Sequence, residues 1–552
     1  MIGGRKRAKS ANIKQQRQAQ IKRQKQNGGK EEQAPRKRPG MRGWVGPGRG
    51  EAGVVQMAEE WRGTTVQACG LWPFSVGTGT PMVGVPIGRN LSSGATLCCD
   101  PISWFQRAKL ISNPSAFVLG KPGLGKSTII RRMATGIAGY GGQPLVLGDL
   151  KPDYVDLIEA LGGQVITLGR GRGHLNILDP GESRAAARRL TGKARSRVLA
   201  DAHGRRLNMV SALLTIMRSS PPTDREETIL DRSLKVLDDR LDEVPVLPDL
   251  LQVIQEAPDD VRQVALDRGS MDRYREITDG LEASLIGLCG GGRLGETFSK
   301  PTTNAMVRDR PVVFDVSSID DSEMDLQAAV LLACWSAGFG TVNVANALAD
   351  AGLEPRRHYF VILDELWRAL RAGRGMVDRV DALTRLNRQR GVGMAMCSHT
   401  MSDLMSLANE EDRMKARGFV ERSGMVICGG LPAAEMPMLQ SAIPFSQAEQ
   451  NMLMGWQDPP AWDPATNREA EPPGRGKFLV KVGGRPGIPV NLQLTSVESE
   501  INDTNKLWHQ TSRVGTTEAE PPEPADTVAE SDAQDTTDGA ESRPQSDAAA
   551  HS

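Results

Sequence analysis

A glycine-rich run at residues 120–128, GKPGLGKST, has the residue types and spacing of a phosphate-binding loop. It matches the pattern GxxxxGK[ST], with a short apolar run before it and a helical pattern after it. The glycines let backbone N–H groups converge on phosphate oxygens, and the start of the helix adds a favourable dipole. We expect Lys126 to reach the β- and γ-phosphates and Ser127 to bind Mg²⁺. The residues predicted to hold the nucleotide are Gly120, Lys121, Pro122, Gly123, Leu124, Gly125, Lys126, Ser127 and Thr128.

Two adjacent carboxylates close another apolar run. The letters YFVIL at residues 359–363 lead directly into Asp364 and Glu365. A carboxylate at a strand end can hold the shell of Mg²⁺, and its neighbour can orient or deprotonate an attacking water. We assign Asp364 to magnesium and Glu365 to the water. The pair favours a hydrolase over a kinase, because a kinase would need a pocket for its acceptor and the sequence indicates none.

Two further polar groups adjoin this chemistry. His399 lies within Ser398-His399-Thr400, at the end of the next apolar run, where a polar residue can sense the γ-phosphate or simply cap a helix. Basic residues occupy the helical pattern before that run, and one of them could neutralise the transition state in a neighbouring subunit. A solvated basic helix face is the alternative. These basic residues are Arg385, Arg388 and Arg390, of which Arg385 and Arg388 join Lys126, Glu365 and His399 as candidate catalytic residues.

The pattern of apolar runs predicts the elements that must bring these residues together. Continuous apolar strands separated by helices indicate an α/β fold with a parallel sheet covered on both faces. The strands are expected at residues 115–120, 144–150, 164–169, 310–317, 358–366, 391–398 and 425–430, with helices at 126–138 and 153–161. Residues 477–482 and 488–495 predict a C-terminal hairpin. Residues 328–349 are the most apolar long stretch but contain several Ser, Thr and Asn residues, so a buried helix is expected rather than a membrane span.

Charge is distributed very unevenly along the 552 residues, although the formal net charge is only +1. Residues 1–50 hold fifteen Lys and Arg against two Glu, and residues 515–552 hold ten Asp and Glu against one Arg. The body between them therefore has a net charge of about −3. The basic arm suits DNA, an anionic lipid surface or a protein partner equally well. The acidic tail could shield the arm when no partner is present.

These observations divide the chain into six segments. We expect a disordered basic arm (1–50), a small β-rich lead-in (51–110), the P-loop half of the core (111–182), a helical insertion (183–290), the second half of the core with the hairpin (291–495) and an acidic disordered tail (496–552). Seven cysteines without a CxxC pair indicate buried thiols in a reducing compartment. No apolar segment follows the basic start, so no signal peptide is expected. The 238 residues between Lys126 and Asp364 exceed what compact P-loop domains need, which argues against simple GTPase-like folds.

At this point the chain resembles the conjugative-transfer and type IV secretion ATPases of the TraC type, in the HerA–FtsK superfamily of P-loop motors. The stretches that carry the resemblance are GKPGLGKST (120–128), VLGDLKPDY (146–154), LNILDP (175–180), VILDELWRAL (361–370) and LTRLNRQRGVG (383–393). The resemblance implies a RecA-like ATPase core over roughly residues 80–495, often hexameric, that uses ATP and Mg²⁺. By motif match, the resemblance implies the family's catalytic and metal-binding roles for Lys126, Ser127, Asp364 and Glu365, and more loosely for the arginines near residues 385–390. The family usually has a glutamine where His399 stands.

The resemblance also implies a function. It predicts ATP hydrolysis that powers conjugative DNA transfer or type IV secretion, by a motor docked on channel components at the cytoplasmic face of the inner membrane. The alternative is a coupling protein or HerA/FtsK-like translocase that pumps DNA directly. Such coupling proteins usually carry N-terminal membrane spans. No such span is expected in this sequence, which favours the secretion ATPase, whereas the basic arm favours a protein that pumps DNA. A P-loop scaffold without activity is disfavoured by the intact set of Lys126, Ser127, Asp364 and Glu365.

Overall fold

The structure is a computed structural model that describes residues 80–501 with internal gaps. The described ranges are 80–169, 171–290, 294–320, 322–371, 377–378, 380–381, 391–460, 462–463, 468–469 and 471–501. The basic arm of residues 1–50, part of the lead-in and nearly all of the acidic tail lie outside them. The chain divides into two units, Met1–Thr495 and Ser496–Ser552. In the second unit, Ser496–Ile501 forms helix α20.

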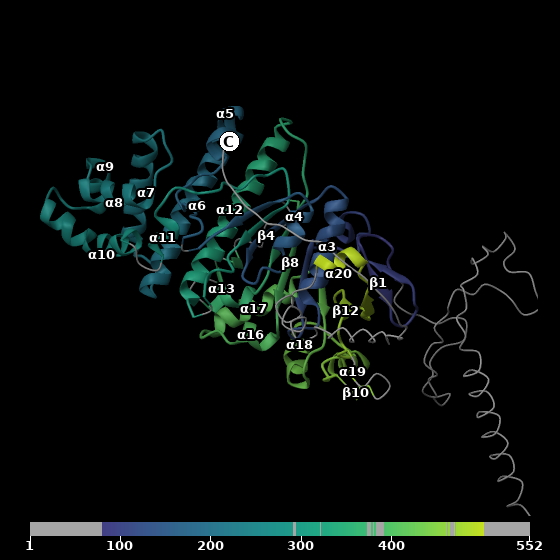
Figure 1. The fold of residues 1–552 in the computed structure, drawn as a ribbon. Helices are drawn as coiled ribbons and strands as arrows, with labels where there is room; N and C mark the ends of the chain where they lie inside the picture. The colour runs from purple at the N-terminus through teal and green to yellow at the C-terminus, as the bar shows by residue number, and fades with distance from the viewer. Residues whose placement is uncertain are drawn as a thin grey trace, which may run out of the picture. The chain divides into compact units, whose positions relative to one another are not determined.

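The first unit is built on one sheet of eleven described strands in the order β2-β1-β13-β12-β9-β3-β8-β7-β4-β6-β5 (Figure 1). The strands are β1 (Pro86–Asn90), β2 (Thr96–Cys98), β3 (Ser115–Leu119), β4 (Gln143–Asp149), β5 (Gln164–Thr167), β6 (Val312–Asp315), β7 (Tyr359–Leu363), β8 (Val392–Ser398), β9 (Met425–Cys428), β12 (Lys477–Lys481) and β13 (Ile488–Leu492). The short strands β10 (Trp462–Asp463) and β11 (Arg468–Glu469) pair separately.

Seven neighbouring strands of the sheet, from β5 to β9, run parallel. Every residue of the central strands β3, β7 and β8 is buried, as expected for strands covered on both faces. The α/β prediction is therefore confirmed, and each predicted strand is present, most with slightly shorter bounds and β4 shifted by one residue. Because carboxyl ends of parallel strands meet at one edge, the segments that follow β3, β8, β7 and β4 are brought together there.

The sheet is not parallel throughout. The predicted hairpin forms as β12 and β13, and β12 pairs antiparallel with β9 at the open edge of the parallel strands. The lead-in strands β1 and β2 continue this antiparallel part, with β1 against β13. Short connections reverse the chain within the β12–β13 and β1–β2 pairs, so neither of these two pairs needs a crossover helix. The domain boundaries given above remain a prediction.

The described residues of the first unit also form helices on and beside the sheet. They are α2 (Pro101–Gln106), α3 (Lys126–Gly139), α4 (Val155–Ala160), α5 (Ser183–Arg189), α6 (Gly192–Arg218), α7 (Asp224–Arg240), α8 (Leu247–Glu256), α9 (Asp259–Ala265), α10 (Met271–Cys289), α11 (Gly295–Phe298), α12 (Met324–Asp350), α13 (Leu366–Arg371), α16 (Met401–Met405), α17 (Glu410–Glu421), α18 (Met436–Ala442) and α19 (Gln447–Gly455). A 3₁₀ turn at Ala433–Glu435 precedes α18.

Residues 183–290 contain only helices, α5 to α10, as the sequence predicts for the insertion. The helices α7 to α10 lie to one side of the sheet, while α6 packs along α12 (Figure 1). Local signals set these elements: a capping box of Thr223 and Glu226 starts α7, and its face of Leu230, Leu234 and Leu237 is buried. The insertion is therefore anchored to the sheet through the α6–α12 pair.

The helix α12 is the element expected at residues 328–349. Among the described residues it is the one helix long and apolar enough to cross a membrane, and 78% of its most apolar window is buried inside the protein. It packs on β4, where Gly148 lies so close to Leu331 that a Cβ would clash with it. The expectation of a buried helix is confirmed.

Candidate nucleotide site

The predicted P-loop connects β3 to α3, as its flanking patterns require. Gly123 and Gly125 have φ values of +79° and +99°, a region in which a side chain would be strained, and α3 begins directly after Gly125. A Cβ on Gly120 would lie 3.2 Å from the Cα of Gly429, just beyond the end of β9. The glycines are thus needed for the turn and for close approach to the neighbouring strand.

Neighbouring segments hold the loop in place. The Lys121 N–H donates to the Gly430 carbonyl at 3.0 Å, and the Leu124 carbonyl accepts from the Gly476 N–H at 3.1 Å. Lys126 is 8% exposed, and its Nζ donates to the loop's own Lys121 carbonyl at 3.3 Å. Neighbouring segments therefore fix the shape of the loop, and its lysine is hydrogen-bonded across it.

The acidic pair follows β7 at the same edge of the sheet. Asp364 accepts hydrogen bonds from the Tyr154 hydroxyl at 3.3 Å and from the Glu365 N–H at 2.9 Å. Burial raises the pKa of Asp364, and the neighbouring charge of Glu365 raises it further, against a hydrogen bond from Cys397. The Asp364 carboxylate is thus a buried negative charge that a cation would stabilise.

The pKa of Glu365 is shifted in the opposite direction from that of Asp364. Burial alone would raise its pKa, but donors outweigh that effect and lower the pKa to about 2. Trp367 Nε1 donates to Oε2 at 2.5 Å, while His399 Nε2 and Lys151 Nζ lie 3.3 Å and 3.5 Å from Oε1. The backbone of Glu365 has a φ of +49°, a left-handed conformation that costs roughly 1–2 kcal/mol in a residue other than glycine. Such strain is typical of functional positions.

His399 lies between the loop and the acidic pair. Its carbonyl accepts from the Gly120 N–H at 3.0 Å and its Nε2 faces Glu365, while its Nδ1 is buried with no hydrogen-bond partner. Within the same Ser398-His399-Thr400 group, the Thr400 side chain caps α16 by accepting from the Asp403 N–H. The structure thus places His399 at the site, and its role as a sensor remains a prediction.

Four residues at this edge received no role from the sequence: Asp149, Lys151, Asp153 and Tyr154. Asp149 ends β4, and its carboxylate accepts from the backbone N–H groups of Tyr154 at 2.7 Å and Asp153 at 3.3 Å. The Ser127 hydroxyl hydrogen-bonds to the Asp153 carboxylate. The available signal was the stretch DLKPDY at the end of a predicted strand, but only the pairing of β4 with β7 shows that it reaches the site.

The carboxylates around Ser127 fit a divalent cation. Burial raises the pKa of Asp149 and of Asp153, as it does for Asp364, so negative charge is under-compensated here. Hydroxyl and carboxylate oxygens are the ligands that Mg²⁺ prefers. The described residues contain no cluster of three or more His, Cys, Asp or Glu suited to a metal ion, so a cation would draw further oxygens from phosphates and water.

The predicted arginines Arg385 and Arg388, like Arg390, lie outside the described residues, so the structure does not place them. The transition-state role predicted for them stays a prediction.

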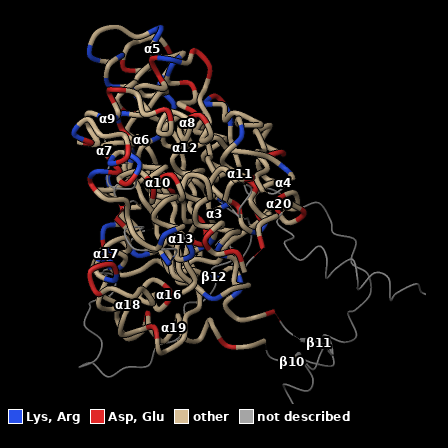
Figure 2. Tube along the Cα trace, turned by 90° about the vertical axis from the view of Figure 1, so that its left-hand side faces the viewer, with Lys and Arg blue, Asp and Glu red and all other residues tan. Residues whose placement is uncertain are grey.

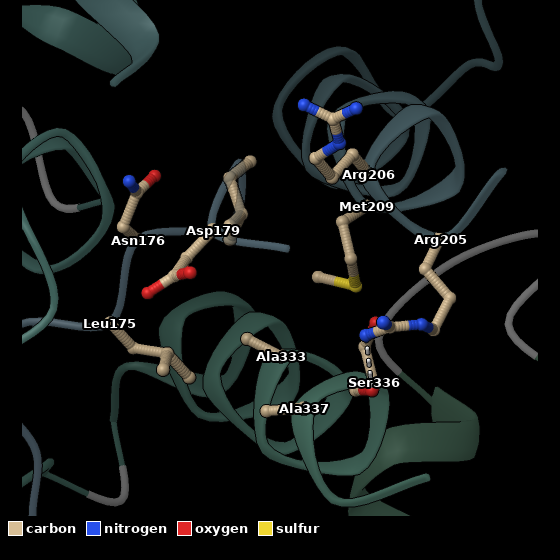
Figure 3. A pocket seen from close by; sticks show the side chains of 10 residues that line it. Leu175, Asn176, Asp179, Arg205, Arg206, Met209, Ala333, Ser336 and Ala337 are labelled. Carbon is tan, nitrogen blue, oxygen red and sulfur yellow. Dashed lines mark hydrogen bonds between the residues drawn. The ribbon is translucent and has the colours of Figure 1, made fainter. Parts of the chain in front are cut away.

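A separate cavity lies between α6, α12 and residues 175–179, at the root of the insertion (Figure 3). Arg205 lines it and donates to the Ser336 carbonyl at 3.3 Å, while the neighbouring Arg206 pairs with Asp238 at 2.8 Å. Its volume is about 30 Å³, room for a water molecule or two. This cavity is therefore too small for a nucleotide.

Comparison with known proteins bears on the fold. No protein-family model matches the chain, and no characterised protein matches it by sequence. The solved structure of VirB4 of Thermoanaerobacter pseudethanolicus is similar over 77% of this chain and 100% of that chain, with a TM-score of 0.54 and 16% identity.

Two looser overlaps involve conjugation proteins. The plasmid coupling protein TrwB, in complex with ADP and Mg²⁺, covers 69% of this chain and 86% of its own, with a TM-score of 0.42 and 14% identity. The pCW3 conjugation coupling protein TcpA, with ATPγS, covers 77% and 70%, with a TM-score of 0.25 and 13% identity. The chain shares the fold of the VirB4 structure, a RecA-like P-loop fold with a mostly parallel sheet and helices.

Proposed function

We propose that this chain is an ATPase that hydrolyses ATP with Mg²⁺ to power conjugative DNA transfer or type IV secretion. The observation that supports hydrolysis most directly is the convergence of three segments at one sheet edge. They are the P-loop with Lys126, the Asp153 carboxylate bonded to Ser127, and Glu365 held beside His399. Sharing its fold with VirB4 supports the pathway.

In this proposal each residue of the site has a specific role in binding or hydrolysis. The backbone N–H groups of the loop and the Lys126 ammonium bind the phosphates. Ser127, Asp153 and Asp364 would hold Mg²⁺, which supplies charge neutralisation on the β- and γ-phosphate oxygens when bound. Glu365 accepts a hydrogen bond from the attacking water and orients it.

The same proposal includes an oligomeric state and binding partners. It would act as a homo-oligomer, a hexamer by resemblance, on channel components at the cytoplasmic face of the membrane. Arg385 or Arg388 of one subunit would complete the site of its neighbour. Residues 1–50 would bind DNA or anionic lipid by their charge.

A specific observation favours the alternative, a translocase that grips DNA itself. Residues 183–197, in α5 and the start of α6, hold six Lys and Arg and no Asp or Glu, and Arg188, Lys193, Arg195 and Arg197 are exposed. Figure 2 shows Lys and Arg at α5 and both signs of charge scattered over the rest of the described chain. Such a basic segment suits DNA phosphates.

The test is steady-state ATP hydrolysis by the full chain with Mg²⁺, with and without single- and double-stranded DNA. A secretion ATPase should turn over ATP at a rate that DNA changes by less than about twofold. Strong stimulation by DNA, lost when Arg188, Arg195 and Arg197 are replaced by Glu, would establish the translocase instead. Absence of hydrolysis under all conditions would refute both.

The arm is tested by removing residues 1–50. Binding of the chain to DNA or to vesicles with anionic lipid should weaken while basal hydrolysis stays the same. If binding to DNA and to anionic vesicles is unchanged after the deletion, the arm would instead be assigned to binding a protein partner.

A further inference from the structure

The two oxygens of the Glu365 carboxylate have different environments. Oε2 accepts from the indole N–H of Trp367 at 2.5 Å. Oε1 faces His399 Nε2 at 3.3 Å and Lys151 Nζ at 3.5 Å. The carboxylate is therefore held firmly on one side and loosely on the other.

We propose that Trp367 is a positioning residue that fixes Oε2 of Glu365 and thereby turns Oε1 toward the attacking water. This inference rests on the proposed hydrolysis and names the group that orients its water-binding carboxylate. In this role Trp367 acts through Glu365, to which its indole N–H donates, rather than on the nucleotide or the water.

The Trp367 ring is itself clamped. The guanidinium of Arg371 lies over it at 4.5 Å from the ring centroid, and that of Arg368 lies at 5.2 Å. Arg371 Nε donates to the Ser406 hydroxyl at 2.8 Å, just after α16, and Nη2 lies 3.5 Å from Asp403. The indole is thus tied to a second element, so its N–H has a fixed direction.

The partners of Oε1 are easier to displace. The Lys151 side chain is 58% exposed, and its distance to Oε1 is long for a hydrogen bond. The charges of Lys151 and, when protonated, His399 are attracted by phosphates, whereas a neutral indole N–H is not. Arrival of a nucleotide would draw partners away from Oε1 and leave the bond at Oε2 in place.

The decisive variant is Trp367→Phe, which keeps a ring against Arg371 and removes the N–H. Loss of one hydrogen bond to a charged group should lower kcat about 10- to 100-fold. The KM and the affinity for ATP should stay within about threefold, because the phosphate-binding groups are untouched. A second variant replaces Trp367 with 3-benzothienylalanine, which keeps the two-ring shape and exchanges the N–H for sulfur.

The matched control is Trp104→Phe. Trp104 is fully buried, and its indole N–H donates at 3.0 Å to the carbonyls of Val83 and Cys98, away from the site. This control should keep the wild-type kcat even if the melting temperature falls.

The outcomes separate cleanly. A loss of kcat with ATP binding intact, shared by both Trp367 variants and absent from the control, supports the inference. A wild-type kcat in either Trp367 variant, or a parallel loss of ATP affinity, overturns it while the proposed hydrolysis stands. If the unaltered chain hydrolyses no ATP, the proposed function fails and the inference falls with it.

Discussion

The hydroxyl of Ser127 hydrogen-bonds to the carboxylate of Asp153, a residue that lies 26 positions further along the chain. One residue lies in the first turn of α3 after the P-loop and the other follows β4, and two strands, β8 and β7, lie between β3 and β4 in the sheet. Burial raises the pKa of Asp153, so its charge is costly without a cation. The pair supports the proposed Mg²⁺ site.

Asp153→Asn should therefore weaken the use of magnesium. The amide keeps the shape of the side chain but removes the charge, so the Mg²⁺ concentration needed for half-maximal hydrolysis should rise at least about tenfold. Titration of the ATPase rate with Mg²⁺ measures this. Asp201→Asn, on exposed α6 surface where the carboxylate bonds Asn343, should titrate like the wild type. An unchanged requirement in the Asp153 variant would assign that residue to loop structure.

Lys126→Ala should abolish hydrolysis and weaken ATP binding. The Lys126 ammonium is expected to bind the β- and γ-phosphates, and Lys126 is nearly buried within the loop. Turnover and nucleotide affinity should be measured together, with Lys300→Ala at an exposed position as the control. Equal turnover in the Lys126 variant would contradict the enzyme reading.

Glu365→Gln should bind ATP but barely turn it over, with kcat reduced by about two orders of magnitude or more. The amide is similar in size but is a poorer acceptor for the water's proton and loses the attraction of His399 and Lys151. Equilibrium binding of labelled ATP and single-turnover hydrolysis separate the two effects. Weak ATP binding in this variant would move Glu365 to a structural role.

An ion-pair network away from the site should control stability in acid. Arg308, with Arg189 and Arg357, lowers the pKa of Glu354 well below its usual range, against a smaller opposing effect of burial. A carboxyl whose pKa is lowered on folding stabilises the protein above its unfolded pKa of about 4.5 and loses that contribution as the pH falls toward the folded value.

Glu354→Gln should therefore lower the free energy of unfolding at pH 7 by about 1–3 kcal/mol, because Arg189 and Arg357 lose their carboxylate partner and Arg308 keeps only Glu182 among the described carboxylates. Urea denaturation at pH 7, 5 and 3.5 measures the difference from the wild type, which should be constant between pH 7 and 5 and shrink below about pH 4.5. Glu159→Gln, an exposed control, should show little difference at any pH. A difference that does not depend on pH would show that packing, not charge, dominates at Glu354.

Several features were determined by the sequence itself. The loop from Gly120 to Thr128, the apolar strand that ends in Asp364 and Glu365, the buried helix α12 and the helical insertion all follow from local patterns. Glycine spacing and hydrophobic periodicity act over a few residues, so they can be seen without knowing what lies next to them.

Only the tertiary structure decided which of these local elements meet. The order of strands places β4 beside β7 and so brings Asp153 to Ser127, and it turns a C-terminal hairpin into an antiparallel extension of the sheet. The hydrogen bond from Trp367 to Glu365 forms where the backbone of Glu365 has a positive φ. The Trp367 ring packs against Arg371, which in turn donates to Ser406 just after α16. These contacts arise from long-range strand pairing and packing, whose partners are distant in sequence and leave no periodic signal in the chain.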